Sequence, residues 1–235
     1  MINENLYTEV LDSLGRKPRK SSASVKPSSL TCVRRMTFEL LAFPKKESVS
    51  PEDRLLMDTG TAIHRMIQDH LKDAVPIVRP GWEFHSEVRV NAKTCRKAAE
   101  LLVSSSLDGV FEGTPTGRRV LEIKTIGDSA MSALKSPKAE HVEQLNTYLY
   151  LVDAPFGDLM YVNRANTSFF KFYERPFNEK LWQATLEKIR MAMQGASEHR
   201  LPPTPATDYT CKICPYQYTC RKKGEWIDAA RPDGG

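Results

Sequence analysis

The stretch Leu107–Thr125, LDGVFEGTPTGRRVLEIKT, decides the fold, because it places charged residues inside two apolar segments that read as neighbouring strands. Asp108 lies in the first segment, 104–113, and Glu122 and Lys124 lie in the second, 118–127. The Gly- and Pro-containing sequence TPTG joins the two as a turn. Residues i and i+2 of a strand share a face, so Glu122 and Lys124 project together while Ile123 points into the core. A hairpin then brings Asp108 to the same place.

Two carboxylates that converge without a counter-charge repel each other and raise one pKa. A hard divalent cation removes that conflict, because Mg²⁺ prefers oxygen ligands and keeps several waters. Lys124 is placed to orient or help deprotonate a metal-bound water, which is equipment for phosphodiester hydrolysis. The alternative interpretation is a surface Glu122–Lys124 pair on a half-exposed strand, with Asp108 as a turn residue beside Gly109.

Length and composition restrict the class of protein. The chain has 235 residues, 40% of them hydrophobic and 27% charged, which is typical of a globular domain. The formal net charge of +5 is compatible with an anionic partner. No segment has the apolar length of a membrane span, and the polar, acidic start MINENLYTEVLDSL is not that of a signal peptide. We therefore expect a cytoplasmic location, where five cysteines favour metal binding or free thiols over disulfides.

The pattern along the chain predicts a short helix and a basic, serine-rich linker in residues 1–27, a single domain in 28–223 and a tail in 224–235. Within the domain, apolar periodicity predicts α/β architecture with one central mixed sheet flanked by helices. The expected helices are 28–43, 57–71, 141–152 and 178–193, and the expected strands are 84–92, 104–113, 118–127, 156–165 and 167–177.

Three further residues fit the same chemistry. His64 follows Ile63 at the edge of the apolar face of its helix and has an imidazole to offer to the same metal, although a lone helical histidine is often structural. Gln144 and Tyr148 are four residues apart and share one helix face. They are placed to reach a phosphate or the lysine, and the alternative for them is a buried hydrogen-bonded pair. His141, at the start of that helix, is expected at the surface.

The joint pattern is Gly60-x-x-x-His64, then Leu107-Asp108-Gly109, Glu122-Ile123-Lys124 and Gln144-x-x-x-Tyr148. It resembles the PD-(D/E)XK nuclease superfamily, specifically the RecB-like branch, over residues 28–176. The resemblance implies a restriction-endonuclease-like fold with Asp108, Glu122 and Lys124 as the catalytic triplet. It also implies that His64 and the Ile123 carbonyl are metal ligands, and that Gln144 and Tyr148 belong to the active site. Leu107 stands where the nominal motif has proline.

The cysteines near the end of the chain form the pattern C-x₂-C-x₅-C at Cys211, Cys214 and Cys220. Three soft ligands this close in sequence predict a metal or cluster site that needs a fourth ligand, Cys32 or Cys95. From the residues alone, zinc and a [4Fe–4S] cluster both remain open.

One cysteine before the core and three after it resemble the iron–sulphur nucleases, which include the AddB nuclease domain and the CRISPR-associated Cas4-type exonucleases. That resemblance implies a [4Fe–4S] cluster on Cys32, Cys211, Cys214 and Cys220, which joins the N- and C-terminal parts of the domain. Cys95 is then an ordinary small hydrophobe. The expected role of the cluster is structural.

The sequence therefore predicts an enzyme: a metal-dependent deoxyribonuclease that uses Mg²⁺ or Mn²⁺ and prefers single-stranded DNA ends. Endonuclease activity and partnership with recombination or CRISPR proteins also fit the resemblance, and the oligomeric state is not indicated. Two alternatives stay open: a non-catalytic DNA-binding or assembly subunit of the same fold, and a zinc-stabilised interaction protein.

Overall fold

The computed structural model describes residues 9–10, 23–45, 50–203, 211–212 and 214–223. The predicted helix in residues 1–14 lies outside the described residues apart from Glu9 and Val10. The predicted tail, 224–235, lies outside them entirely.

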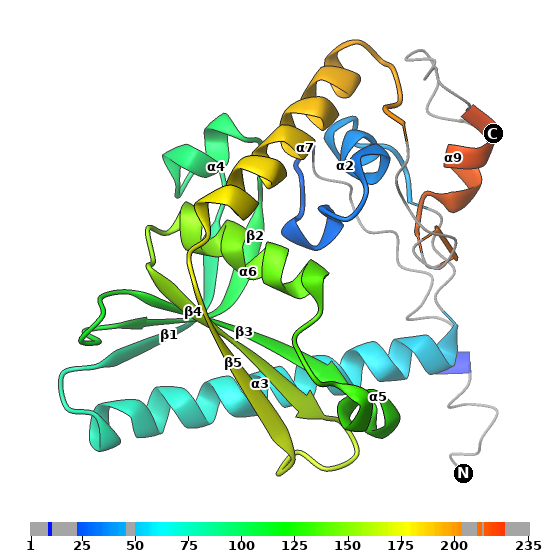
Figure 1. Cartoon of the computed structure of the whole chain (residues 1–235). Coiled ribbons are helices and arrows are strands. Elements are labelled where there is room, and N and C mark those ends of the chain that lie inside the picture. Colours follow the sequence, from blue (N-terminus) through cyan, green and yellow to red (C-terminus); the bar gives the residue numbers. More distant parts are fainter. Residues whose placement is uncertain (1–8, 11–22, 46–49, 204–210, 213, 224–235) are drawn as a thin grey trace.

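A five-stranded mixed sheet forms the centre of the molecule (Figure 1), as the sequence predicts. Its strands lie side by side in chain order: β1 (Glu83–Val90), β2 (Ser105–Glu112), β3 (Arg119–Ile126), β4 (Phe156–Asn163) and β5 (Phe170–Pro176). The pairs β1–β2, β2–β3 and β4–β5 are antiparallel, and β3–β4 is parallel.

The parallel pair needs a crossover connection, which α5 (Asp128–Ala133) and α6 (Ala139–Leu151) provide. Residues 143–149 of α6 are all buried, between the sheet on one side and α7 (Glu179–Ser197) on the other. Gly157 in β4 permits this close approach, because a Cβ there would lie only 2.8 Å from Leu145 Cδ1. The sequence predicts α6 within two residues at each end.

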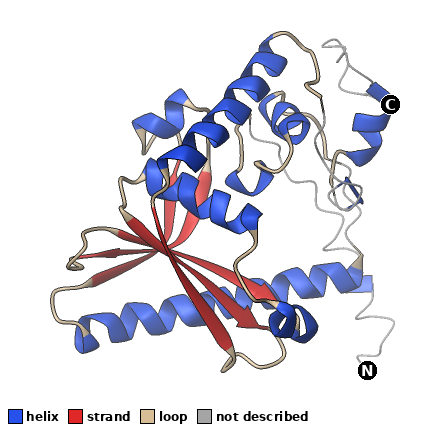
Figure 2. Ribbon diagram, viewed as in Figure 1, coloured by secondary structure: helices blue, strands red, loops and turns tan. Residues whose placement is uncertain are grey.

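Helices cover the two faces of the sheet (Figure 2). The long α3 (Pro51–Val78) lies along one face, and α6, α7 (Glu179–Ser197), α2 (Val33–Leu40) and α4 (Arg96–Glu100) lie on the other. Helix α3 is longer than the predicted 57–71, because the Ser50 side chain caps its start by accepting from Asp53 N at 3.1 Å.

The alternation of side chains on β3 feeds two hydrophobic cores. Leu121 and Ile123 pack under α3 with Ile63, and Val120 packs on the α6 side with Leu145. Ile123 is fully buried, which confirms the prediction that it points away from its charged neighbours. Because Leu121 and Ile123 are anchored in the core under α3, the alternate residues Glu122 and Lys124 project to the α6 side.

The predicted linker in residues 15–27 is folded into the domain at its end. Val25 is fully buried and forms an isolated parallel bridge with Val103, with its N–H 2.8 Å from the carbonyl oxygen of Leu102. Residues 27–29 then form a short 3₁₀ turn, η1. The segment that the sequence predicts as a linker therefore includes two core residues, Val25 and Pro27, because both side chains are buried in the domain.

The predicted helix at 28–43 begins later than expected. Cys32, not a serine, is the N-cap residue of α2, and Ser29 Oγ instead donates to the buried carboxylate of Glu39 at 2.7 Å. Two short helices, α4 and α5, and the helix α9 (Gln217–Lys223) were not predicted, because segments of five to seven residues carry too little periodicity.

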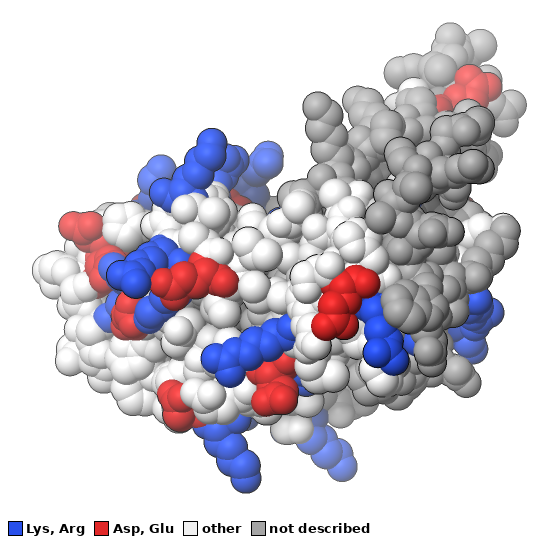
Figure 3. All heavy atoms as spheres, turned by 90° about the horizontal axis from the view of Figure 1, so that it is seen from above, with Lys and Arg blue, Asp and Glu red and all other residues white. Residues whose placement is uncertain are grey.

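Surface charge on the helical face is mixed. Figure 3 shows Lys, Arg, Asp and Glu side chains interspersed there, so no field of one sign distinguishes this face. Among the described helices, none combines the length and apolar character needed to cross a membrane.

The burial of Val25 predicts that truncating it destabilises the domain. Val25→Ala should lower the free energy of unfolding by about 1–3 kcal/mol, since it removes buried methyl groups and leaves a cavity. Urea denaturation followed by circular dichroism measures this. Val78→Ala is the matched control, because Val78 is 59% exposed and its truncation should change the free energy by less than about 0.5 kcal/mol. Equal values for the two variants would contradict the assignment of Val25 to the core.

Candidate active site

The centre of the sheet opens into a fork between β2 and β3. Their ladder reaches only to Gly109 and Leu121, whereas β1 continues alongside β2 and β4 alongside β3. Asp108 is the first residue of β2 past the ladder, and its Oδ2 accepts a hydrogen bond of 2.7 Å from the N–H of Ile123. The carboxylate thereby replaces the lost strand partner of that N–H. Asp108 thus lies opposite β3, as the hairpin argument predicts.

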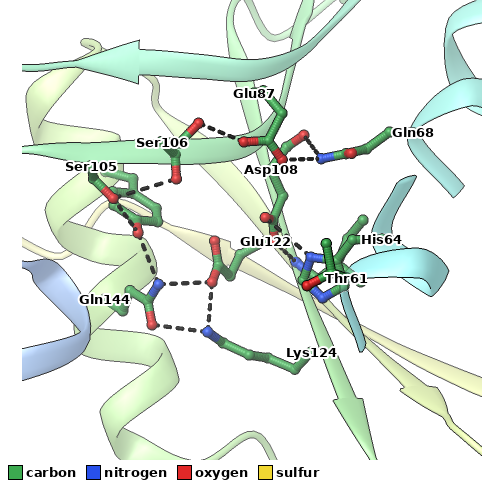
Figure 4. A network of polar contacts seen from close by, with 12 residues as sticks. Thr61, His64, Gln68, Glu87, Ser105, Ser106, Asp108, Glu122, Lys124 and Gln144 are labelled. Carbon is green, nitrogen blue, oxygen red and sulfur yellow. Dashed lines mark hydrogen bonds and ion pairs between the residues drawn. The ribbon is translucent and has the colours of Figure 1, made fainter. Parts of the chain in front are cut away.

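The backbone of Asp108 is held from the other side by α3. Gln68 donates from Nε2 to the carbonyl oxygen of Asp108 at 2.8 Å and to Glu87 Oε1 at 2.9 Å (Figure 4). Glu87 has a left-handed backbone, with φ of 53°, and is skipped in the described β1–β2 register. The amide of Gln68 therefore stands in for a ladder hydrogen bond that the strands do not make.

His64 precedes Gln68 by one turn and faces the same carboxylate. Its Nδ1 lies 3.3 Å from Asp108 Oδ1. Burial lowers the pKa of His64, but the hydrogen bond to Asp108 and the negative charges of Asp108 and Glu122 outweigh burial and raise that pKa overall. The structure thus brings together two of the predicted metal ligands.

Glu122, Lys124 and Gln144 form a closed triangle on the α6 side (Figure 4). Lys124 Nζ lies 2.6 Å from Glu122 Oε1 and donates to Gln144 Oε1 at 2.9 Å. Gln144 Nε2 donates to Glu122 Oε1 at 2.8 Å, so the one amide contacts both charged groups. The alternative interpretation of a surface pair is wrong, because Glu122 is only 3% exposed.

The triangle extends along α6 to Tyr148. Gln144 Nε2 also lies 2.8 Å from Tyr148 OH, and that hydroxyl lies 2.9 Å from Ser105 Oγ on β2. Burial raises the pKa of Tyr148, and the nearby charge of Glu122 raises it further, so the phenol stays neutral. Tyr148 is therefore a neutral hydrogen-bonding residue that locks Gln144 in place.

Burial dominates the electrostatics of Glu122. It raises the pKa of Glu122 to about 7, together with the negative charge of Asp108 and against the opposing effect of Lys124. A carboxylate whose charged form is costly at neutral pH is a group that a cation would stabilise.

The donor set fits a hard divalent cation. It offers two carboxylates and an imidazole, together with the Ile123 carbonyl, which lies on the same edge of β3 as the N–H that Asp108 holds. In the part of the chain that the structure describes, no three His, Cys, Asp or Glu side chains are already arranged to hold an ion. The two carboxylates are instead held by protein groups: His64 and the Ile123 N–H contact Asp108, and Lys124 and Gln144 contact Glu122 Oε1.

Four of the five cysteines line one pocket between α2 and the α9 region. The pocket is lined by Cys32, Cys211, Cys214 and Cys220, with Arg34 and Arg35 beside them. Cys95 lies elsewhere, with its Sγ 3.3 Å from the carbonyl oxygen of Leu151. The four cysteines that the resemblance assigns to one site thus line one pocket, and Cys95 lies outside it.

The cysteine pocket is apolar around the thiols. Phe38 and Tyr216 stack beside it with ring centroids 5.2 Å apart, and Cys214 and Cys220 pack against this aromatic pair. Burial raises the pKa of the Cys214 thiol and outweighs the opposing effects of a backbone hydrogen bond from Tyr216 and of the Arg35 charge. Binding of a metal or cluster to Cys214 would displace the thiol proton that burial otherwise favours.

Sequence reasoning missed Gln68, Glu87 and Ser105. Gln68 follows His64 by four residues, so the helical spacing of the two was a usable signal. Glu87 and Ser105 carry no such signal, because only the strand register places them beside Asp108 and Tyr148.

Comparison with known proteins agrees with this geometry. The sequence profile of the PD-(D/E)XK nuclease superfamily matches residues 106–221, and no curated protein matches the chain. The fold is similar to that of SSO0001, with a TM-score of 0.54 and 20% identity over 94% of this chain and 96% of that one. It is also similar to an alkaline exonuclease, LHK-Exo, from Laribacter hongkongensis, with a TM-score of 0.52 and 14% identity over 81% of this chain and 93% of that one. For LHK-Exo in complex with dAMP the TM-score is 0.55, at the same identity and coverage.

The raised pKa of Glu122 predicts a pH dependence of stability in EDTA. The folded state binds more protons than the unfolded state between about pH 4.5 and about pH 7, so the free energy of unfolding should fall as the pH rises through that window. Glu122→Gln should flatten this slope and be more stable than the parent above pH 7. Urea denaturation at four pH values measures both effects. Glu100→Gln, at a 57% exposed side chain, should keep the parental slope, and a parental slope in Glu122→Gln would contradict the prediction.

Proposed function

We propose that this chain, whose residues 106–221 match the sequence profile of the PD-(D/E)XK nuclease superfamily, is a member of that superfamily and a metal-dependent deoxyribonuclease that hydrolyses phosphodiester bonds at single-stranded DNA ends. The observation that carries the proposal is the fork between β2 and β3, where Asp108, Glu122 and Lys124 converge with Gln144. In this proposal His64, Asp108, Glu122 and the Ile123 carbonyl hold Mg²⁺ or Mn²⁺. Such an ion supplies Lewis-acid stabilisation of phosphate charge and lowers the pKa of a water ligand.

The protein residues then have distinct tasks. The Lys124 ammonium donates to the attacking water or to a phosphate oxygen, and it balances negative charge at the phosphorus. Gln144 fixes where that ammonium lies, because its amide contacts Lys124 and Glu122 at once. Tyr148 and Ser105 in turn hold the amide of Gln144 in one orientation.

The preference for DNA ends is the finer part of the proposal. It is supported by the alkaline exonuclease LHK-Exo and its complex with dAMP, which share this fold. The net charge of +5 favours association with a polyanion. Endonuclease activity and action beside recombination or CRISPR proteins remain compatible with the same site.

We also propose a [4Fe–4S] cluster on Cys32, Cys211, Cys214 and Cys220, bound in the pocket that they line. The four thiols line one pocket, which supports a common site for them. The choice of an iron–sulphur cluster over zinc rests on the resemblance of the cysteine pattern to that of the iron–sulphur nucleases. A cluster here would join α2 to the segment before α9 and stabilise the fold.

Removing the lysine of the triplet tests the nuclease. Lys124→Ala should lower the rate of cleavage of linear single-stranded DNA with Mn²⁺ by about 10²–10⁴-fold, because the fork loses its only ammonium group among the described residues. Single-stranded DNA binding in EDTA should persist. Lys180→Ala is the matched control, since Lys180 is exposed on α7, and its rate should equal that of the parent. A parent protein that binds DNA and never cuts it would support a non-catalytic subunit instead.

Replacing one cysteine tests the cluster. Protein purified without oxygen should be brown and contain about four iron atoms per chain, as one [4Fe–4S] cluster requires. Cys214→Ala should lose the colour and much of the solubility, whereas Cys95→Ala should keep both, because its thiol lies outside the pocket. Iron and zinc analysis together with visible absorbance distinguish the cases. A colourless parent with one zinc per chain would overturn the assignment.

A further inference from the structure

A second polar cluster lies beside Lys124 on the α6 side of the sheet. Tyr161 of β4 is in direct register with Lys124 of β3, and Tyr161 is fully buried. His141, in the first turn of α6, covers it: the ring centroids are 5.5 Å apart, and His141 Nδ1 lies 2.8 Å from Tyr161 OH. His141 precedes Gln144 by three residues, so both belong to the face of α6 that overlooks the fork. His141 keeps a partly exposed position, as the sequence predicts, but its ring packs on Tyr161 instead of extending into solvent.

The hydrogen bonds of Tyr161 assign the tautomer of His141. The backbone N–H of Lys138 donates to Tyr161 OH at 3.0 Å, so the phenol oxygen already accepts one hydrogen bond. The phenol has a single proton, and His141 Nδ1 is the acceptor within reach. Donation from Tyr161 to Nδ1 leaves the imidazole proton on Nε2.

The Nε2–H group of His141 makes no hydrogen bond within the described residues. The nitrogen is not fully buried, so its N–H is open to solvent. The ring nevertheless lies in the field of two cations. Burial, followed by the positive charges of Lys124 and Lys138, lowers the pKa of His141 to about 3, so the imidazole is neutral in physiological conditions.

A neutral N–H donor of fixed orientation, beside an ammonium group and with a cationic surrounding, is matched to an anionic oxygen. We propose that His141 is a phosphate-binding residue: its Nε2–H donates to a non-bridging oxygen of the DNA phosphodiester that Lys124 contacts, and Tyr161 is a positioning residue that fixes the donor. This inference rests on the proposed function, and it adds two residues that the triplet and the Gln144–Tyr148 pair do not include.

A pair of substitutions separates the two ring nitrogens. In His141→Gln the side-chain amide can reach the position of Nε2 and keep the donor, whereas in His141→Asn the shorter amide replaces Nδ1 alone. His141→Asn should lower kcat/KM for single-stranded DNA by about 10–100-fold, the usual effect of losing a hydrogen bond to a charged group. His141→Gln should stay within about fivefold of the parent on the same grounds. Thermal melts confirm that both variants are folded.

Salt dependence separates a neutral donor from a charged one. The slope of log Kd against log salt for a labelled single-stranded oligonucleotide in EDTA should be unchanged in His141→Asn, since a neutral contact releases no counterion. In Lys124→Ala the slope should fall by about 0.7, the share of one phosphate contact on a single strand. A changed slope in His141→Asn would overturn the proposed neutral donor.

Nitrogen NMR of the histidine ring tests the geometry without any turnover. The parent protein should show His141 protonated at Nε2 only, and Tyr161→Phe should show a mixture of both tautomers. A proton on Nδ1 in the parent would overturn the assignment. If the parent cuts DNA and His141→Asn cuts equally well, the inference fails and the nuclease stands. If the parent never cuts, the proposed function fails, and the Kd of His141→Asn for the same oligonucleotide still tests the contact: a higher Kd with an unchanged salt slope supports a neutral donor to phosphate, and an unchanged Kd overturns it.

Discussion

The hydrogen bond from the Ile123 N–H to the Asp108 carboxylate is the constraint on which the site depends. Two antiparallel strands that stayed paired would give this N–H to a backbone carbonyl and leave no gap between them. Here a side chain takes the bond instead, so β2 and β3 separate at the centre of the sheet without leaving a buried N–H unsatisfied. The gap that results is where the charged side chains of the fork meet.

The fork also explains how a buried charge is tolerated. Glu122 is nearly inaccessible to solvent, and an uncompensated carboxylate there would be costly. Lys124 and Gln144 compensate it through one shared oxygen, at 2.6 and 2.8 Å. The same contacts hold the lysine in place before any substrate arrives. Preorganised positioning of this kind, together with electrostatic stabilisation, is the main contribution that a protein makes to phosphoryl transfer.

Three polar side chains of α6 face strands β3 and β4 from the same side of the sheet. Gln144 and Tyr148 reach the carboxylate side of the fork, and His141 reaches Tyr161 on the other side of Lys124. The helix is buried along most of its length, so these side chains have little freedom to move. The cysteine pocket lies among different elements, namely α2, α9 and the segment leading into α9. It therefore has no side chain in common with the fork.

The sequence by itself determined the five strands, the four main helices and which charged or polar side chains share a face of one element, because these depend on local periodicity and on spacing within one element. Glu122 and Lys124 share a face of one strand, and Gln144 and Tyr148 share a face of one helix, whatever surrounds them. Only the tertiary structure decided that Val25 belongs to the core, that Gln68 holds the Asp108 backbone and that Tyr161 sets the orientation of His141. Each of these contacts joins segments that are too far apart along the chain for any local pattern to relate them. They are brought together by the register of strands and helices against one another, which no short stretch of sequence encodes.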